Sequence, residues 1–220
     1  YLLEEYKSIT SSASDSIKKM EGDNIKFVLS NSLTFSELDT KFRPSEGYRI
    51  NWYNKYALDH FIHNKISYDV YFNFNKKVLS FRNEVGNVAS LTSDDVPDSD
   101  KFSLGGRKLR GFDIKGVGPR NSSSGYIGGN NIILSQIDYS VPLSEGSNNL
   151  LDLVTFIDFG QIYENKSEPI NREETLRVSV GSGFNLNTPI GPLSITYAIP
   201  IQSESYDKEK RFVFSIGWVN

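Results

Sequence analysis

The chain has 220 residues, which is enough for one β-barrel or β-sandwich domain and too few for a large multidomain enzyme. Its 24 Lys and Arg residues against 27 Asp and Glu give a formal net charge of −3, which excludes the basic footprint of a nucleic-acid-binding protein. The absence of cysteine excludes a disulfide framework and a thiolate metal site, while 14 Phe and 12 Tyr favour β structure.

The first half of the chain is patterned as a series of strands. Residues 1–9 fit the end of a strand, and residues 10–24 are polar and typical of a loop. From residue 25, apolar and polar side chains alternate strictly, which predicts half-buried strands. The predicted strands are 25–35, 48–58, 66–74 and 78–88, and the link at 75–77 predicts a hairpin.

A long irregular segment then interrupts the alternation. Residues 101–120, KFSLGGRKLRGFDIKGVGPR, are rich in glycine and basic residues, and a polar stretch continues to residue 131. Loops of this length are uncommon in compact domains unless they are functional. At its centre, Arg110 stands in the motif Leu109, Arg110, Gly111, Phe112, one guanidinium flanked by apolar side chains. We expect residues 101–131 to fold inward and to find partners on the strands after the loop.

Five more strands are predicted after the loop: 132–142, 151–161, 176–187, 193–201 and 211–219. In the first two of these strands, the alternation places Asp138 and Asp158 on the polar face. Phe156 lies two positions before Asp158 and therefore shares its face. Because a buried arginine needs a charged partner, these two carboxylates are candidate partners of Arg110. The alternative is that Arg110 is a solvated loop residue.

The two faces of the predicted strands indicate a membrane barrel. One face is apolar and aromatic, as lipid contact requires, and the other carries Ser, Thr, Asn, Gly and Tyr, which suit an enclosed lumen. Strands of about 9–11 residues fit an oblique bilayer crossing, and no run of about 18 apolar residues is present. The sequence therefore predicts an all-β fold, a transmembrane antiparallel β-barrel of nine or ten strands, with residues 1–220 as one partial barrel domain.

Several ordered motifs resemble the BamA family of outer-membrane assembly factors. Residues 101–106, 109–112, 116–120 and 128–129 resemble the family's sixth extracellular loop. Similar motifs occur at FIDFG (156–160), PIGPL (189–193), YAIP (197–200) and FVFSIG (212–217), with FRPSEG (42–47) upstream. The resemblance covers at least residues 35–220. It implies the C-terminal nine or ten strands of a sixteen-stranded barrel, with Arg110 held against Asp138 and Asp158 and the loop received by Phe156.

The resemblance also assigns a role to the last predicted strand, which contains Phe212, Phe214, Ile216 and Gly217. In the family this strand is kinked at the matching glycine, beside a weak seam between the first and last strands. Unpaired backbone groups at such a seam can template an incoming strand. The alternative for Gly217 is an ordinary small residue facing the lumen.

The function implied by the resemblance is insertion and folding of β-barrel proteins in the outer membrane of a Gram-negative bacterium, and the alternative is a mitochondrial or plastid homologue. The implied partners are unfolded outer-membrane proteins, accessory assembly lipoproteins and outer-membrane lipid. The related alternatives are a polypeptide-secretion barrel or a TamA-like barrel, although the GVGPR segment at 116–120 favours BamA. A passive porin would share the alternating strands but would not need the arginine loop.

The sequence argues against an enzyme and against a metal or other cofactor. His60 and His63 are the only histidines, and no nucleophile is identifiable beside them. The acidic run 94–100 lacks the spacing of a dedicated Ca²⁺ loop and is typical of a solvated surface. The glycines of the long loop are not set between a strand and a helix, so they do not predict a nucleotide cradle.

Overall fold

The computed structural model describes residues 2–6, 22–120, 125–143, 151–164, 175–188 and 191–216. Its elements are all strands. They are β1 (Leu2–Tyr6), β2 (Gly22–Lys26), β3 (Val28–Leu38), β4 (Gly47–Ala57), β5 (Phe61–Phe74), β6 (Lys77–Ser90), β7 (Gly111–Phe112), β8 (Asn131–Pro142), β9 (Leu151–Tyr163), β10 (Arg177–Thr188), β11 (Gly191–Gln202), β12 (Glu209–Lys210) and β13 (Phe212–Ile216). No helix in these ranges is long and apolar enough to cross a membrane.

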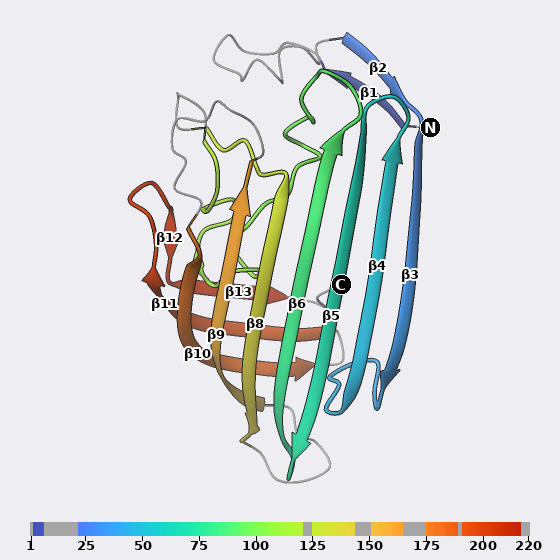
Figure 1. The fold of residues 1–220 in the computed structure, drawn as a ribbon. Coiled ribbons are helices and arrows are strands. Elements are labelled where there is room, and N and C mark those ends of the chain that lie inside the picture. Colours follow the sequence, from blue (N-terminus) through green and yellow to red (C-terminus); the bar gives the residue numbers. More distant parts are fainter. Residues whose placement is uncertain are drawn as a thin grey trace.

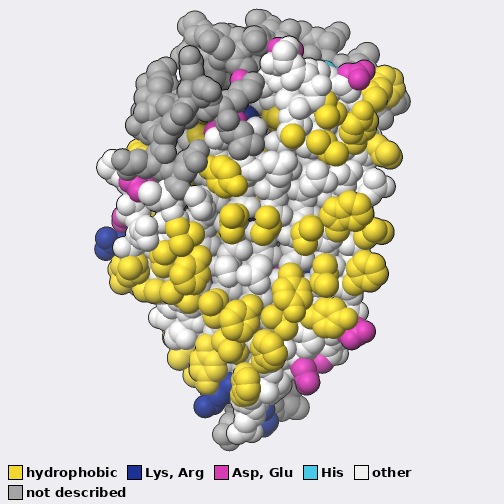
Figure 2. Space-filling view, in the orientation of Figure 1, with side chains coloured by type: hydrophobic (Ala, Val, Ile, Leu, Met, Phe, Trp, Pro, Cys, Tyr) yellow, Lys and Arg dark blue, Asp and Glu magenta, His cyan; other side chains and the backbone are white. Residues whose placement is uncertain are grey.

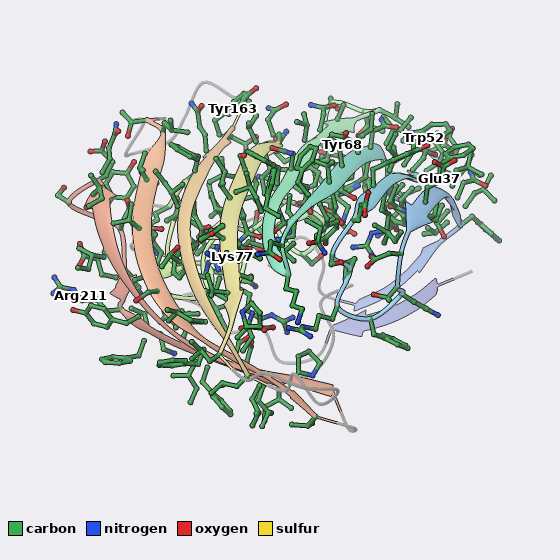
Figure 3. All side chains as sticks on the ribbon, turned by 90° about the horizontal axis from the view of Figure 1, so that it is seen from below. Glu37, Trp52, Tyr68, Lys77, Tyr163 and Arg211 are labelled. Atoms are coloured by element: carbon green, nitrogen blue, oxygen red, sulfur yellow. The ribbon has the colours of Figure 1, made fainter. Side chains whose placement is uncertain are left out.

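One nine-stranded sheet dominates the fold (Figure 1). Its order is β3-β4-β5-β6-β8-β9-β10-β11-β13, and every neighbouring pair is antiparallel. Seen from below, the sheet curves around an inner space, which we call the lumen (Figure 3). Within the described residues, β3 and β13 are its two edges and do not pair with each other. The predicted antiparallel all-β fold is therefore confirmed.

The structure confirms the predicted hairpin but divides one predicted strand. Asn75 and Lys76 connect β5 to β6 with φ angles of 53° and 68°, the left-handed conformations of a two-residue hairpin turn. The predicted strand 25–35, however, is divided. Residue 25 belongs to β2, which pairs with β1 outside the main sheet, and the sheet strand begins at Val28. The alternation continues across the break, so periodicity alone could not locate it.

The outer face of the sheet is apolar along its length (Figure 2). Large hydrophobic side chains from strand after strand are exposed there, including Phe35 on β3, Phe72 on β5, Ile133 on β8, Ile195 on β11 and Phe214 on β13. A water-soluble protein rarely exposes so large an apolar surface, whereas a barrel wall facing lipid requires one.

The inner face is polar toward the short turns but apolar where it meets the long loop. A buried hydrophobic cluster joins the strands β5, β6, β8 and β9 to the loop between β6 and β8. Its members include Phe61, Val88, Ile132 and Ile162 from the strands and Leu104, Leu109, Phe112 and Val117 from the loop. The strands and the loop together thus form a hydrophobic core inside the lumen.

Candidate functional site

The loop between β6 and β8 runs inside the lumen and is held there by backbone pairing. Within the loop, Phe102 pairs with Gly129 and Leu104 pairs with Val117. Its short strand β7 pairs with β12, where Gly111 lies opposite Lys210. The loop therefore has a fixed path, and the arginine motif lies at the point where it meets the C-terminal segment.

Arg110 is buried between two strands of the inner wall. Its guanidinium donates from Nε to Oδ2 of Asp158 over 2.8 Å and from Nη2 to Oδ1 of Asp138 over 2.6 Å. A further Nη2 contact reaches Oδ1 of Asp158, and the Arg110 backbone N–H donates to Oδ2 of the same carboxylate over 3.0 Å. The guanidinium carbon lies 3.5 Å from the centroid of the Phe156 ring. The structure thus brings the loop arginine together with Asp138, Phe156 and Asp158.

Two carboxylates stabilise the charged form of the buried arginine. Burial alone would lower the pKa of Arg110, but Asp138 and Asp158 outweigh it, so the pKa lies above its usual value. Only 8% of Arg110 and none of Asp158 is exposed. Removing one partner of a buried pair of this kind is strongly destabilising, because it leaves an uncompensated buried charge.

Arg82 also belongs to this group of charged residues, although it was not predicted as a partner from the sequence. Arg82 on β6 contacts Oδ2 of Asp138, so two arginines and two aspartates share one neutral group. Its register partner on β8 is Gln136, whose side chain donates to the carbonyl oxygen of Arg107 in the loop. The alternation of β6 places Arg82 on the inner face, so parity could have identified it.

The apolar members of the motif are fully buried, and two glycines make room for them. Leu109 and Phe112 have no exposed surface. A Cβ on Gly160 of β9 would lie 3.3 Å from both methyl groups of Leu109. Gly111 has a φ of +95°, and a Cβ there would lie 3.3 Å from Cβ of Ser179. Only glycine combines this backbone conformation with this approach to the wall.

The start of the loop is anchored by aromatic packing against β5 and β6. The Phe102 ring lies 4.4 Å, centroid to centroid, from the ring of His63 on β5. A Cβ on Gly86 of β6 would lie 2.4 Å from Cζ of Phe102, so the ring occupies the space that this glycine leaves. His63 also meets Tyr53 edge-on, which gives this histidine a packing role.

The acidic run 94–100 is exposed at Asp94 and Asp95, as expected of a solvated surface, but Asp98 and Asp100 are partly buried and paired. Asp100 lies 2.6 Å from Nζ of Lys55 on β4, and Asp98 lies 3.6 Å from Nζ of Lys101. Asp100 therefore connects the loop to β4. Only contacts across the fold could reveal this, because Lys55 is distant in sequence.

The last strand forms one edge of the sheet. Phe212, Phe214 and Ile216 of β13 point outward with about 60% or more of their surface exposed. Among the described residues, β13 pairs in the main sheet with β11 alone. Gly217, expected at a kink, lies outside the described residues.

A comparison with known families decides where the chain belongs. The Omp85 superfamily domain matches residues 2–218. The chain belongs to the Omp85 superfamily. Members of this superfamily are outer-membrane β-barrel proteins, so this chain is part of such a barrel.

Curated relatives of this Omp85 chain carry the name outer membrane protein assembly factor BamA. One from Nitratidesulfovibrio vulgaris (strain Hildenborough) is 30% identical over 231 residues, covering 99% of this chain and 29% of the relative. One from Neorickettsia risticii (strain Illinois) is 30% identical over 220 residues, covering 93% of this chain and 29% of the relative. The predicted resemblance to BamA is confirmed, and the chain spans less than a third of these relatives.

A solved structure agrees with the fold. The crystal structure of BamA from Haemophilus ducreyi lacking POTRA domains 1–3 matches with a TM-score of 0.75 and 23% identity. The match covers 86% of this chain and 41% of that chain. At this identity the likeness concerns the barrel fold alone.

Proposed function

We propose that this chain is the C-terminal part of a barrel that inserts and folds β-barrel proteins in the outer membrane. The observation that carries the proposal is the attachment of the arginine loop beside the sheet edge. The motif binds the inner wall at β8 and β9, and its strand β7 pairs with β12, the segment that leads into edge strand β13. The curated relatives, named as assembly factors, support the same activity.

The proposed mechanism uses the backbone groups of the edge. A strand with a free side presents unpaired N–H and C=O groups that an incoming strand can complete. Its exposed outer residues Phe212, Phe214 and Ile216 would keep such a substrate strand in contact with lipid. The loop would brace the wall behind this edge while the edge itself exchanges partners. The chemistry needs no metal, cofactor or covalent step, and the substrates would be unfolded outer-membrane proteins, with accessory lipoproteins as further partners.

The test is insertion by the full-length protein. Wild-type protein reconstituted in liposomes should increase the rate at which an unfolded barrel protein becomes protease-resistant, and Arg110→Ala should reduce that rate while the barrel still folds. A full-length protein that folds and does not accelerate insertion above empty liposomes would contradict the proposal.

A passive porin is disfavoured by the packing of the loop. The buried side chains of Leu104, Leu109, Phe112 and Val117 occupy the lumen beside β8 and β9. A channel for solutes would need that space filled with water. Conductance measurements on the full-length protein separate the two functions.

A further inference from the structure

Arg177, at the start of β10, is another buried arginine outside the loop motif. Arg177 is 1% exposed. Its Nε donates to Oδ2 of Asp207 over 2.9 Å and its Nη2 donates to Oδ1 over 3.2 Å, a two-pronged contact with a carboxylate that has no exposed surface. Nη2 also donates to the Tyr206 hydroxyl over 2.9 Å. We call this contact the Arg177–Asp207 clamp.

The clamp also orders the backbone around it. Nη1 of Arg177 donates to the carbonyl oxygen of Thr175 over 2.6 Å, and Oδ2 of Asp207 accepts the backbone N–H of Glu204 over 2.8 Å. The Asp207 N–H donates to the Glu204 carbonyl oxygen over 3.0 Å. Residues 204–207 thus form a turn closed on one carboxylate, and that carboxylate is fixed to the wall by Arg177.

The segment after this turn connects the loop motif to the edge strand. Lys208 exchanges backbone hydrogen bonds with Asp113 and Gly116 of the loop, and β12 pairs with β7. The chain then returns to β11, where the Ala198 N–H donates to the Arg211 carbonyl oxygen over 2.8 Å, and β13 begins at the next residue. The clamp therefore fixes a segment that touches both the arginine loop and the start of the edge strand.

We propose that Arg177 is a positioning residue for the edge strand. Through Asp207 it holds the loop-side end of β13 against β11, so movement of the edge is confined to the end near Ile216. This inference deepens the proposed insertion function and rests on it, since it assigns which end of the edge strand is available to exchange partners. The described register between β11 and β13 runs only from Tyr197–Phe212 to Leu193–Ile216, so the two ends can be probed separately.

The experiment compares disulfide formation at the two ends. The described segment has no native cysteine, so Tyr197→Cys with Phe212→Cys reports the clamped end and Leu193→Cys with Ile216→Cys reports the far end. Each pair is placed in the full-length protein in membranes, with Arg177→Gln or Asp207→Asn added. We expect the initial rate of disulfide formation at Tyr197–Phe212 to fall severalfold, with little change at Leu193–Ile216.

The matched control removes a charge from the same segment without touching the clamp. Arg211 contacts Glu209 at 3.6 Å, and both side chains are about half exposed, so Arg211→Gln should leave both rates unchanged. Equal slowing of both pairs would mean that Arg177 supports the whole hairpin, and unchanged rates would mean that the clamp holds nothing. Either result overturns the inference.

Insertion activity separates this inference from the proposed function. If Arg177 acts only by holding the loop-side end of β13, the oxidised Tyr197–Phe212 disulfide should raise insertion by Arg177→Gln protein to the level of the same cysteine pair with Arg177 intact. Failure of that rescue, with the wild type active, would overturn the positioning role alone. If the two cysteine pairs respond to Arg177→Gln as expected, but the wild-type protein folds and does not insert substrate, the proposed function is overturned and the clamp remains.

Discussion

Asp158 accepts both the backbone N–H and the guanidinium of Arg110, a residue 48 positions earlier in the chain. Its side chain has no exposed surface. A carboxylate on the barrel wall therefore depends on the loop for its hydrogen bonds, and the loop depends on the wall for its charge balance. This mutual dependence explains why a glycine-rich loop can hold one position inside the lumen.

Removing the charge of Asp158 should loosen the loop. Asp158→Asn leaves Arg82 and Arg110 with Asp138 as their shared carboxylate, so one buried positive charge is uncompensated. Loss of one partner from a buried pair costs about 3 kcal/mol. We expect trypsin to cut the loop of the full-length variant faster at Arg107 and Lys108 than it cuts the wild type.

The matched control for this prediction lies on the same strand and the same face. Asp152 pairs with Arg43, whose side chain is 39% exposed. Asp152→Asn therefore leaves no buried charge of the loop without its partner. Its trypsin pattern should match the wild type. Equal cleavage of both variants would show that the loop responds to any change on β9.

Gly86 tests the anchor at the start of the loop. Gly86→Ala places a methyl group 2.4 Å from Cζ of Phe102, which is impossible without displacing the ring from His63. Overpacking of this kind costs about 1–3 kcal/mol. We expect a lower unfolding temperature in detergent, and partial recovery when Phe102→Leu is added, because the smaller side chain frees the space. Additive losses in the double variant would contradict the packing argument.

Arg82 should matter less to the loop than Arg110 does. Arg82→Gln leaves Arg110 between Asp138 and Asp158 and removes a side chain that is 27% exposed, so the loop keeps its main contacts. In the insertion assay we expect a smaller loss for Arg82→Gln than for Arg110→Gln. A larger loss for Arg82→Gln than for Arg110→Gln would contradict this prediction and would make Arg82 the more important of the two arginines for insertion.

The apolar half of the loop should act as a plug. Deletion of residues 104–118 from the full-length protein removes Leu104, Leu109, Phe112 and Val117 from the buried cluster. We expect the deletion variant to show large, steady openings in planar bilayers where the wild type shows few. Similar conductance for the two proteins would mean that other segments close the lumen.

Much of the fold is predictable because strand alternation is a local signal. Each of the nine strands of the main sheet overlaps its predicted range, and the largest difference is at β5, which begins at Phe61 instead of residue 66. The hairpin at Asn75 and Lys76 agrees with its turn residues. The break between β2 and β3 is not predictable in this way, because the alternation passes through it. Pairing partners, and not side-chain periodicity, decide where one strand ends and the next begins.

By itself, the sequence determined the two faces of the barrel wall and the inward direction of Asp138 and Asp158, since each side chain's face depends only on its position along its own strand. The tertiary structure decided which charges meet. Arg82 joins Arg110 at Asp138, and Arg177 reaches Asp207, because curvature of the sheet and the path of two loops bring together residues far apart in sequence. No local pattern encodes those distances.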